Sequence, residues 1–391
     1  MISVDRTSQE ISESSGRRKK ESFWVSGGYF DYQILFILIV LVLFGILMVF
    51  SSSSYRAVIN GVDSAYYARR QAIFALLGFV AMMIVSKVNY KFFQHFSVLL
   101  IYISIALSIV VLVIGTASNG ATRWIPIGPI HFQPSEIAKP AIIIYVAHAC
   151  VKQSRLLNNL LGIAKMCALP LIAIVFIASE NLSTAVVCFA IMFIIVFVAS
   201  PRFWNLVGLF VGGVAAAILA ITTVGYRGAR IDAWLNPETS ENGFQTMQSL
   251  YAIGSGGLFG KGLGQSIQKM GFLPEPHNDM IFSVICEELG LFGAIGVILL
   301  FAFLIYRCRY IANNAADSFG GLIVTGVIAH IAIQMIINVA VVTNTIPNTG
   351  VTLPFVSYGG TSLVFMMIEI GMVLSVSRQI RPYEKKIAKE M

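Results

Sequence analysis

The residues best suited to chemistry lie in a polar strip between Gly271 and Gly290 that reads GFLPEPHNDMIFSVICEELG. Asp279 follows two prolines, a histidine and an asparagine, and a long apolar run begins directly after it. A carboxylate in this place is expected near a helix N-terminus, where it can cap the helix and is favoured by the helix dipole. If it is desolvated instead, its pKa rises toward the range that suits a general base near neutral pH. The spacing leaves both interpretations open, cap and catalyst.

The sequence around this strip is strongly hydrophobic. Of the 391 residues, 57% are hydrophobic and 12% are charged, and the mean hydropathy is +0.80. These values predict an all-α polytopic membrane protein. Because the bilayer core requires about 20 apolar residues per helix, the sequence predicts ten transmembrane helices, at residues 33–53, 72–86, 96–115, 137–151, 161–178, 182–199, 204–223, 280–306, 319–343 and 357–377.

The charges of the polar intervals predict how the chain is arranged across the membrane. With a cytoplasmic N-terminus, most Lys and Arg residues fall on cytoplasmic segments, as the positive-inside rule requires. We expect a disordered basic cytoplasmic tail at 1–25, a transmembrane domain at 26–380 and a second cytoplasmic tail at 381–391. The large extracytoplasmic loop, 224–279, lies between helices seven and eight. The net charge of +8 is then explained by topology and by anionic lipid headgroups, and nucleic acid is not an expected partner.

Two segments of this loop have distinct local patterns. Residues 244–253 have apolar side chains at helical spacing, which predicts a short amphipathic or re-entrant helix. The glycine run at 254–264 that follows predicts a flexible segment. This run lacks the spacing of a phosphate loop and has no Ser or Thr after Lys261, so nucleotide binding is not expected.

Four charged residues stand inside or at the start of predicted helices, where an unpaired ion is costly. Glu287 and Glu288 lie about 12 to 14 Å along a helix from Asp279, too far for a carboxylate pair with it, and are expected to contact polar groups of neighbouring helices. Glu136 and Lys139 share one helix face. They form either an ion pair at a helix entry or a site in which Lys139 meets a diphosphate while Glu136 holds it.

Four further residues are candidates for substrate binding. Arg70 stands at the outer end of the second predicted helix and suits a phosphate or a lipid headgroup. Trp124 is either an interfacial anchor or a face for a sugar ring. Ser357 belongs to LPFVSYGGTS, whose irregular backbone is expected to line a cavity. His277 stands in the polar strip itself.

The spacing of the remaining histidines and of the cysteines does not indicate a metal site. His148 and His330 are isolated within predicted helices, where core positions are expected. The cysteines have neither metal-ligand nor redox spacing and are expected to be small buried hydrophobes. They are Cys150, Cys167, Cys188, Cys286 and Cys308.

Several motifs together resemble the SEDS family, named for shape, elongation, division and sporulation. The resemblance spans roughly residues 30–380, and within the family the segments 348–354 and 180–185 are more similar to the division branch than to the elongation branch. The motifs are LPEPHNDMIF at 273–282, EELG at 287–290, RWI at 123–125, QPSE at 133–136 with Lys139, and LPFVSYGG at 353–360.

This resemblance implies a ten-helix peptidoglycan glycosyltransferase that acts at the division septum, on the outer face of the bacterial plasma membrane. Its substrate would be lipid II, the undecaprenyl-diphosphate-linked disaccharide-pentapeptide. Asp279 would take the proton from the acceptor 4-hydroxyl group, and a divalent cation, Mg or Mn, is left open as a cofactor. The implied partners are a class B penicillin-binding protein transpeptidase and other divisome membrane proteins. The candidate substrate-binding residues are Arg70, Trp124, Glu136, Lys139, His277 and Ser357.

The sequence departs from the family pattern in two places. Asn278-Asp279-Met280 stands where Thr-Asp-Phe is usual, which keeps the proposed base. Residues 179–183 read SENLS where many members have Glu-Pro-Asp-Leu-Gly. The second change removes an acid and puts any role of that position in doubt.

Other functions are compatible with the same residues. A flippase or transporter for lipid II would use Glu369, Glu287 and Lys139 along a translocation path. A non-catalytic scaffold would recruit a transpeptidase through apolar helix faces. An elongation or a sporulation polymerase would share the chemistry and differ in its role.

Overall fold

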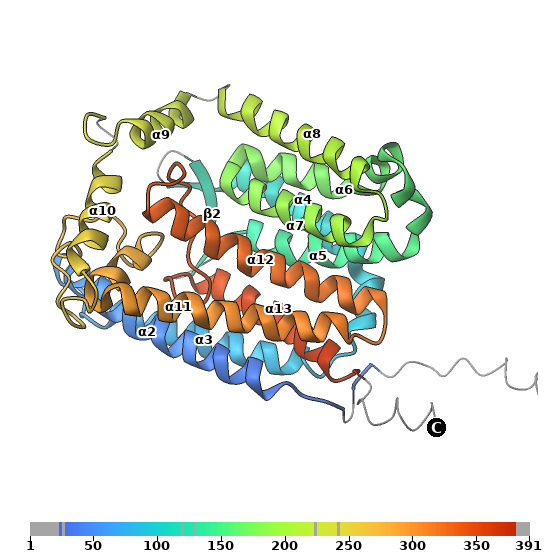
Figure 1. The fold of residues 1–391 in the computed structure, drawn as a ribbon, viewed down its shortest axis with the longest axis horizontal. Helices are drawn as coiled ribbons and strands as arrows, with labels where there is room; N and C mark the ends of the chain where they lie inside the picture. The colour runs from blue at the N-terminus through green and yellow to red at the C-terminus, as the bar shows by residue number, and fades with distance from the viewer. Residues whose placement is uncertain are drawn as a thin grey trace, which may run out of the picture.

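The computed structural model describes residues 23–25, 28–118, 121–127, 130–222, 225–240 and 243–380. This part of the chain is mostly helical (Figure 1). Its long helices are α2 (Tyr32–Ile59), α3 (Tyr66–Val85), α4 (Phe93–Ile114), α5 (Ser135–Lys152), α6 (Leu160–Glu180), α7 (Leu182–Ala199), α8 (Phe203–Thr222), α11 (Ile281–Asn313), α12 (Ser318–Val342) and α13 (Gly360–Ser377). Its shorter elements are the 3₁₀ turns η1 (Tyr90–Phe92) and η2 (Ser154–Asn158), the helices α9 (Gly225–Leu235) and α10 (Phe244–Gly256), and the strands β1 (Thr116–Ser118), β2 (Ala121–Ile127) and β3 (Ile130–Phe132).

Among the described residues, eight helices are long and apolar enough to cross a membrane: α2, α3, α4, α6, α7, α11, α12 and α13. The protein is therefore a multi-pass membrane protein. Helices α5 and α8 occupy the two other predicted spans. The helices α9 and α10 lie at the end of the bundle opposite the C-terminal end of α13 (Figure 1), and we call this end the site end.

Helix α12 lies at the centre of the packing, against α5, α7, α11 and α13. Several of its apolar side chains, among them Ile323 and Val327, are fully buried. One face also carries His330, Gln334 and Asn338, all buried, at intervals of four residues. Since residues four apart share one helix face, this spacing makes a polar stripe inside an apolar bundle.

The segment after α4 is a small antiparallel sheet, ordered β1-β2-β3, which the prediction of an all-α protein did not include. Thr116 pairs with Trp124, and Ile125 pairs with Phe132. The β-branched and aromatic residues of β2 favour strands, and its helix neighbours are α4 and α6. The segment between α4 and α5 is too short to form a membrane-spanning helix, and its residues form paired strands instead.

Residues 23–25, at the end of the predicted tail, lie against the turn between α3 and η1. The Val25 amide donates to the Lys87 carbonyl at 2.9 Å, and the Asn89 amide donates to the Phe23 carbonyl at 2.8 Å. The Phe23 ring contacts Phe92 edge-on, with centroids 4.6 Å apart. The remainder of the two predicted tails, 1–22 and 381–391, lies outside the described residues.

Helix α11 is interrupted at Gly290, which has φ +67°. A glycine is required there because a Cβ atom would lie 2.4 Å from the Gly260 amide nitrogen. The carbonyls of Glu287 and Glu288 accept hydrogen bonds from the amides of Lys261 and Gly262, each at 2.9 Å. The glycine run predicted to be flexible is therefore a hydrogen-bonded turn against the interrupted helix, and its glycines supply left-handed conformations.

Glu287 is fully buried and binds this turn with its carboxylate. It accepts hydrogen bonds from Lys261 Nζ at 2.8 Å, from the Ile267 amide at 3.1 Å and from the Ser266 hydroxyl. The ion pair with Lys261 and these additional donors satisfy a charge that burial would otherwise make costly.

Glu288, also fully buried, binds both the turn and α2. Lys269 Nζ lies 2.7 Å from its Oε1, the Ser51 hydroxyl donates to the same oxygen at 2.6 Å, and the Gly264 amide donates to Oε2 at 3.0 Å. We call Glu287 and Glu288 the carboxylate clamp. The predicted partners were polar groups of neighbouring helices. Ser51 of α2 and Ser255 of α10, whose hydroxyl donates to Glu287 at 3.4 Å, are such groups, but both lysines come from the preceding loop.

We expect Glu288→Ala to destabilise the protein by about 3 to 5 kcal/mol, because it leaves the Lys269 ammonium buried without its counter-ion. Thermal unfolding in detergent measures this. The control is Arg69→Ala, which removes an ion pair with Asp63 whose side chains are 63% and 54% exposed, and this change should cost less than about 1 kcal/mol. Equal destabilisation by the two changes would contradict a stabilising role for the clamp.

Candidate functional site

Asp279 lies in the turn that leads into α11 at the site end. This turn follows the loop whose Lys261 and Lys269 are held by the carboxylate clamp. The N-cap position of α11 belongs to Met280, and no side chain caps it. The Asn338 side-chain amide donates to the Asp279 carbonyl at 2.7 Å and to the Val351 carbonyl at 2.9 Å. The backbone of Asp279 is thus held by α12, whereas its carboxylate is not used as the helix cap. The geometry favours the second of the two interpretations of Asp279.

The carboxylate of Asp279 lies in a partly exposed position with one oxygen shielded. The residue as a whole has intermediate exposure, but Oδ1 is buried and has no hydrogen-bond partner among the described residues. Gly350, with φ +69°, lies beside the carboxylate, so that a Cβ atom there would be 3.9 Å from Oδ2. A buried carboxylate oxygen without a hydrogen-bond donor is uncommon in proteins. Such an oxygen is free to accept a hydrogen bond, and then a proton, from a substrate hydroxyl group.

The surroundings raise the pKa of Asp279 to about 7. Burial is the main cause because it disfavours the charged form, and the negative charge of Glu275 adds to it. Arg230 and the adjacent backbone amides act in the opposite direction and lower the pKa. A carboxylate with a pKa near neutrality exchanges a proton readily at physiological pH, which suits general acid–base chemistry.

Glu275 connects the polar strip to α2. Its carboxylate forms an ion pair with Arg56 at 3.0 Å and accepts a hydrogen bond from the Asn278 side-chain amide. Its backbone has φ +50°, a conformation that is uncommon outside glycine. The strip is therefore fixed in an irregular turn by contacts to α2 on one side and to α12 on the other.

Next to Asp279 in sequence, His277 is buried in an aromatic cluster. Its ring lies 4.8 Å from the Tyr67 ring and 5.7 Å from the Tyr358 ring, centroid to centroid. The Tyr358 amide donates to the His277 carbonyl at 2.8 Å. Burial lowers the pKa of His277 to about 4, so the imidazole is neutral at pH 7 and can serve as a hydrogen-bond donor or acceptor.

Arg70 and Ser357 approach the same cluster from α3 and from the turn before α13. The guanidinium of Arg70 lies 5.6 Å from the Tyr66 ring centroid, and its charge acts on Tyr358. Ser357 is buried, and its hydroxyl accepts a hydrogen bond from the Leu353 amide at 2.8 Å. Its carbonyl accepts one from the Gln71 side chain at 3.0 Å. Three predicted site residues, Arg70, His277 and Ser357, are thus brought together around Tyr358, next to Asp279.

Glu136 and Lys139 belong to a different polar group inside the bundle. Their ion pair is 2.8 Å long, with side chains 6% and 2% exposed. The charges of Glu136, Lys139 and Glu369 all reach Cys188 of α7, which places α5, α7 and α13 around them. The sequence predicted the pair itself but did not indicate this environment.

The structure also pairs two residues that the sequence left apart. His330 Nδ1 lies 2.6 Å from Glu369 Oε2, and both side chains are 1% exposed. His330 is a core residue as predicted, although it is not isolated. The i,i+4 spacing of His330, Gln334 and Asn338 was the available signal, since three polar residues on one face of an apolar helix must find partners.

Trp124 is half-buried on β2, whose helix neighbours are α4 and α6.

Arg230 of α9 was missed by the sequence analysis. Its guanidinium donates to the Asn348 carbonyl at 3.2 Å, and its charge reaches Asp279. No local pattern marks Arg230, because its partners are far away in sequence.

Within the described residues, no group of three or more His, Cys, Asp or Glu side chains is placed to hold a metal ion. Near Asp279 the second carboxylate, Glu275, is engaged by Arg56 and Asn278. Mg²⁺ and similar ions prefer several oxygen ligands. These residues alone do not fit a divalent cation, and no step is derived through one.

Comparison with known families and proteins gives consistent matches. The FtsW/RodA/SpoVE family model, described as "Cell cycle protein", matches residues 32–382. The stage V sporulation protein E of Bacillus subtilis is 39% identical over 361 residues, which cover 90% of this chain and 98% of that protein. A probable peptidoglycan glycosyltransferase FtsW of Trichlorobacter lovleyi is 36% identical over 358 residues, which cover 90% of this chain and 94% of that protein.

Solved structures show the same fold. A chain of the structure reported as "Structural coordination of polymerization and crosslinking by a peptidoglycan synthase complex" matches with a TM-score of 0.72 and 25% identity, covering 90% of this chain and 99% of that one. The rod shape determining protein RodA of Thermus thermophilus matches with a TM-score of 0.63 and 27% identity, covering 89% and 97%.

The raised pKa of Asp279 predicts a pH-dependent stability. The fold favours the protonated form, so this contribution to stability is complete below the ordinary carboxyl pKa and is lost as the pH rises through about 7. Asp279→Asn mimics the protonated form. We therefore expect its Tm to exceed that of the wild type by an amount that grows between pH 5 and pH 8.

Thermal unfolding of both proteins across this pH range measures the difference. Asp232→Asn is the control, because the pKa of the exposed Asp232 is lowered by hydrogen bonds to Ser240 and Asn236 and the group does not titrate in this range. A difference between Asp279→Asn and wild type that stays constant with pH would contradict the assigned pKa.

Proposed function

Because the chain belongs to the FtsW/RodA/SpoVE family, it is a peptidoglycan glycosyltransferase, and we propose that Asp279 is its general base. The observation that supports this assignment is the environment of the Asp279 carboxylate. It is partly exposed, it has one buried oxygen without a hydrogen-bond donor, and its pKa is raised to about 7. A group with these properties can hold a substrate hydroxyl and accept its proton.

The proposed reaction joins two lipid II molecules or a growing strand and lipid II. The 4-hydroxyl oxygen of the acceptor sugar attacks the anomeric carbon of the donor, and the hydroxyl proton passes to the Asp279 carboxylate. The bond between the anomeric carbon and the diphosphate oxygen breaks, and the lipid diphosphate leaves with the electron pair. Asp279 then returns the proton to water at its exposed side.

The other candidate residues have proposed roles that follow from their surroundings. Arg70 supplies a positive charge next to the aromatic cluster and is the residue that we assign to the departing diphosphate. Neutral His277 offers a hydrogen bond to the saccharide. Ser357 supports this arrangement through its bonds to Leu353 and Gln71.

Glu136, Lys139 and Trp124 line the approach in our proposal. Lys139 is fully buried against Glu136, so it reaches a diphosphate only if the substrate enters the bundle beside α5. Trp124, half-buried on β2, offers a face for a sugar ring. A divalent cation is not needed for these roles.

We place the site end on the outer face of the plasma membrane, with ten crossings, cytoplasmic termini and the 224–279 loop outside. The substrate is then lipid II, and the partner is a class B penicillin-binding protein with other divisome proteins at the septum. The similarity to a chain of a peptidoglycan synthase complex supports such a partner. The similarity to FtsW supports a division role, while the similarity to a sporulation protein keeps sporulation as the alternative.

A lipid II flippase is the second candidate, because charged groups do lie inside the bundle. Each of its three suggested path residues has a partner: Glu369 pairs with His330, Glu287 with Lys261, and Lys139 with Glu136. Vesicles with lipid II separate the two functions. Glycan polymer indicates the transferase, whereas exchange of lipid II between leaflets without polymer indicates the flippase.

We expect Asp279→Asn to reduce glycan polymerisation by about 10² to 10⁴-fold, the usual range for loss of a general base. The purified protein is assayed with lipid II by gel separation of glycan strands. Asp232→Asn, which changes an exposed carboxylate of α9, should stay within about twofold of the wild type. Wild-type activity of Asp279→Asn in a folded sample would exclude Asp279 as the base.

We also expect the rate to rise with pH through about 7, since the base must be ionised. Arg230 lowers the pKa of Asp279, so Arg230→Gln should move this limb of the pH–rate profile to higher pH. A rate measured at pH 9 should be affected less than the rate at pH 6. An unchanged profile would show that Arg230 does not tune the base.

A further inference from the structure

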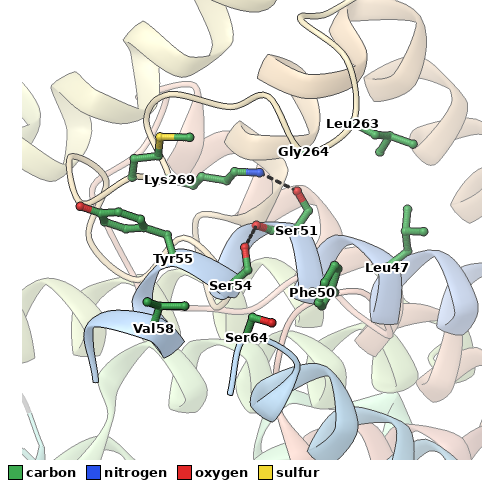
Figure 2. Close-up of a pocket in the computed structure, with 11 residues that line it drawn as sticks. Leu47, Phe50, Ser51, Ser54, Tyr55, Val58, Ser64, Leu263, Gly264 and Lys269 are labelled. Atoms are coloured by element: carbon green, nitrogen blue, oxygen red, sulfur yellow. Dashed lines mark hydrogen bonds between the residues drawn. The ribbon is translucent and has the colours of Figure 1, made fainter. Parts of the chain in front are cut away.

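A groove runs along α2 at the site end, outside the candidate site described above. One wall consists of α2 side chains, among them Leu47, Phe50 and Val58, and Leu263 of the loop before α11 lies across from them (Figure 2). Met270, from the same loop, also lines the groove. The cavity has a volume of about 510 Å³, which is within the range of binding pockets. We call it the α2 groove.

The floor of the α2 groove is electrically neutral. Lys269 Nζ lies 2.8 Å from the Ser51 hydroxyl (Figure 2) and 2.7 Å from Glu288. Its ammonium is 4% exposed and its counter-ion is fully buried. The charge that lines the groove is therefore already compensated, and the groove selects a hydrocarbon chain and not an anionic group.

One wall of the groove belongs to a helix that is long and apolar enough to cross the membrane, and both walls expose apolar side chains. Leu47 and Phe50 are 47% and 46% exposed on α2, one of the membrane-spanning helices, and Leu263 and Met270 are 53% and 46% exposed opposite them. Along α2 the lining extends from Leu47 to Val58, about 16 Å at the rise of an α-helix. An elongated, apolar and open cavity of this kind fits a chain that lies along the helix.

One end of the groove lies beside the strip that carries Asp279. Tyr55, which lines the groove, lies 3.4 Å from where a Cβ atom of Gly271 would be. The next residue, Arg56, forms the ion pair with Glu275, and the charge of Glu275 acts on Asp279. The same turn of α2 thus contacts both the groove and the strip that carries the base.

We propose that the α2 groove binds the isoprenoid chain of the lipid-linked saccharide, with the chain laid along α2 and the saccharide directed to the Asp279 strip. This inference rests on the proposed function. The contact of the same turn of α2 with the groove and with the Asp279 strip favours the substrate over a phospholipid of the bilayer, whose headgroup has no role at that carboxylate.

Leu47→Trp tests the proposal by filling the groove, and Leu43→Trp is the matched control. Leu43 lies one turn away on α2, is 61% exposed and does not line the groove. Both variants are assayed with lipid II and with an analogue that carries a single isoprenoid unit, which is too short to reach Leu47 along the groove. We expect Leu47→Trp to raise KM for the full-length substrate about tenfold. This corresponds to the binding free energy lost when an apolar contact the size of one side chain is no longer buried.

The short-chain analogue should reach the base without filling the groove, so its KM should change less than twofold in Leu47→Trp. Leu43→Trp should change neither KM. Equal KM values for Leu47→Trp and Leu43→Trp with full-length lipid II would overturn the assignment of the groove, although polymerisation by the wild type and its loss in Asp279→Asn would still support the proposed function.

A binding experiment identifies the occupant without relying on turnover. Undecaprenyl diphosphate with a diazirine in its chain is irradiated with the protein in phosphatidylglycerol vesicles, and the labelled peptides are mapped. Labelling of residues 47–58 or 263–270 that unlabelled undecaprenyl diphosphate removes would support the proposal. Labelling elsewhere, or labelling that additional phosphatidylglycerol removes equally well, would overturn it in favour of a bilayer lipid.

Discussion

The arrangement of the site end depends on two adjacent carboxylates that are fully buried. Glu287 and Glu288 each hold a lysine and several hydrogen-bond donors of the preceding loop, and Glu288 also holds Ser51 of α2. Removing one partner from such a buried pair leaves an uncompensated charge, which is strongly destabilising. The clamp thereby fixes a glycine-rich segment that has few apolar contacts of its own, and the polar strip and the α2 groove take their positions from it.

Asp279 stands in contrast to this pair, although all three carboxylates are close in sequence. The clamp residues have donors for their oxygens, whereas Oδ1 of Asp279 is buried with no donor in the described part of the chain. Satisfied charges stabilise the scaffold, and in the proposed mechanism the unsatisfied one accepts the substrate proton. The backbone around Asp279 is fixed by Asn338, and the neighbouring Asn278 is held by Glu275.

Hydrophobic length alone predicted most of the helices, because the bilayer fixes how long an apolar segment must be. The position of Asp279 before α11 and the pairing of Glu136 with Lys139 also follow from local spacing. The break at Gly290 was not predictable in this way, since it depends on the approach of Gly260. The same holds for Arg230 near Asp279 and for His330 with Glu369, which only the packing of distant helices brings together.

The amide side chain of Asn338 joins two segments that carry the site, the Asp279 carbonyl and the Val351 carbonyl, to a single point on α12. Because α12 also packs against α5, α7, α11 and α13, a small rotation of this helix about its axis would carry the base and the adjoining Gly350 loop together. The distance between them would be preserved while their orientation toward an incoming sugar changed. Asn338 therefore couples the positions of both site segments to the packing of the central helix.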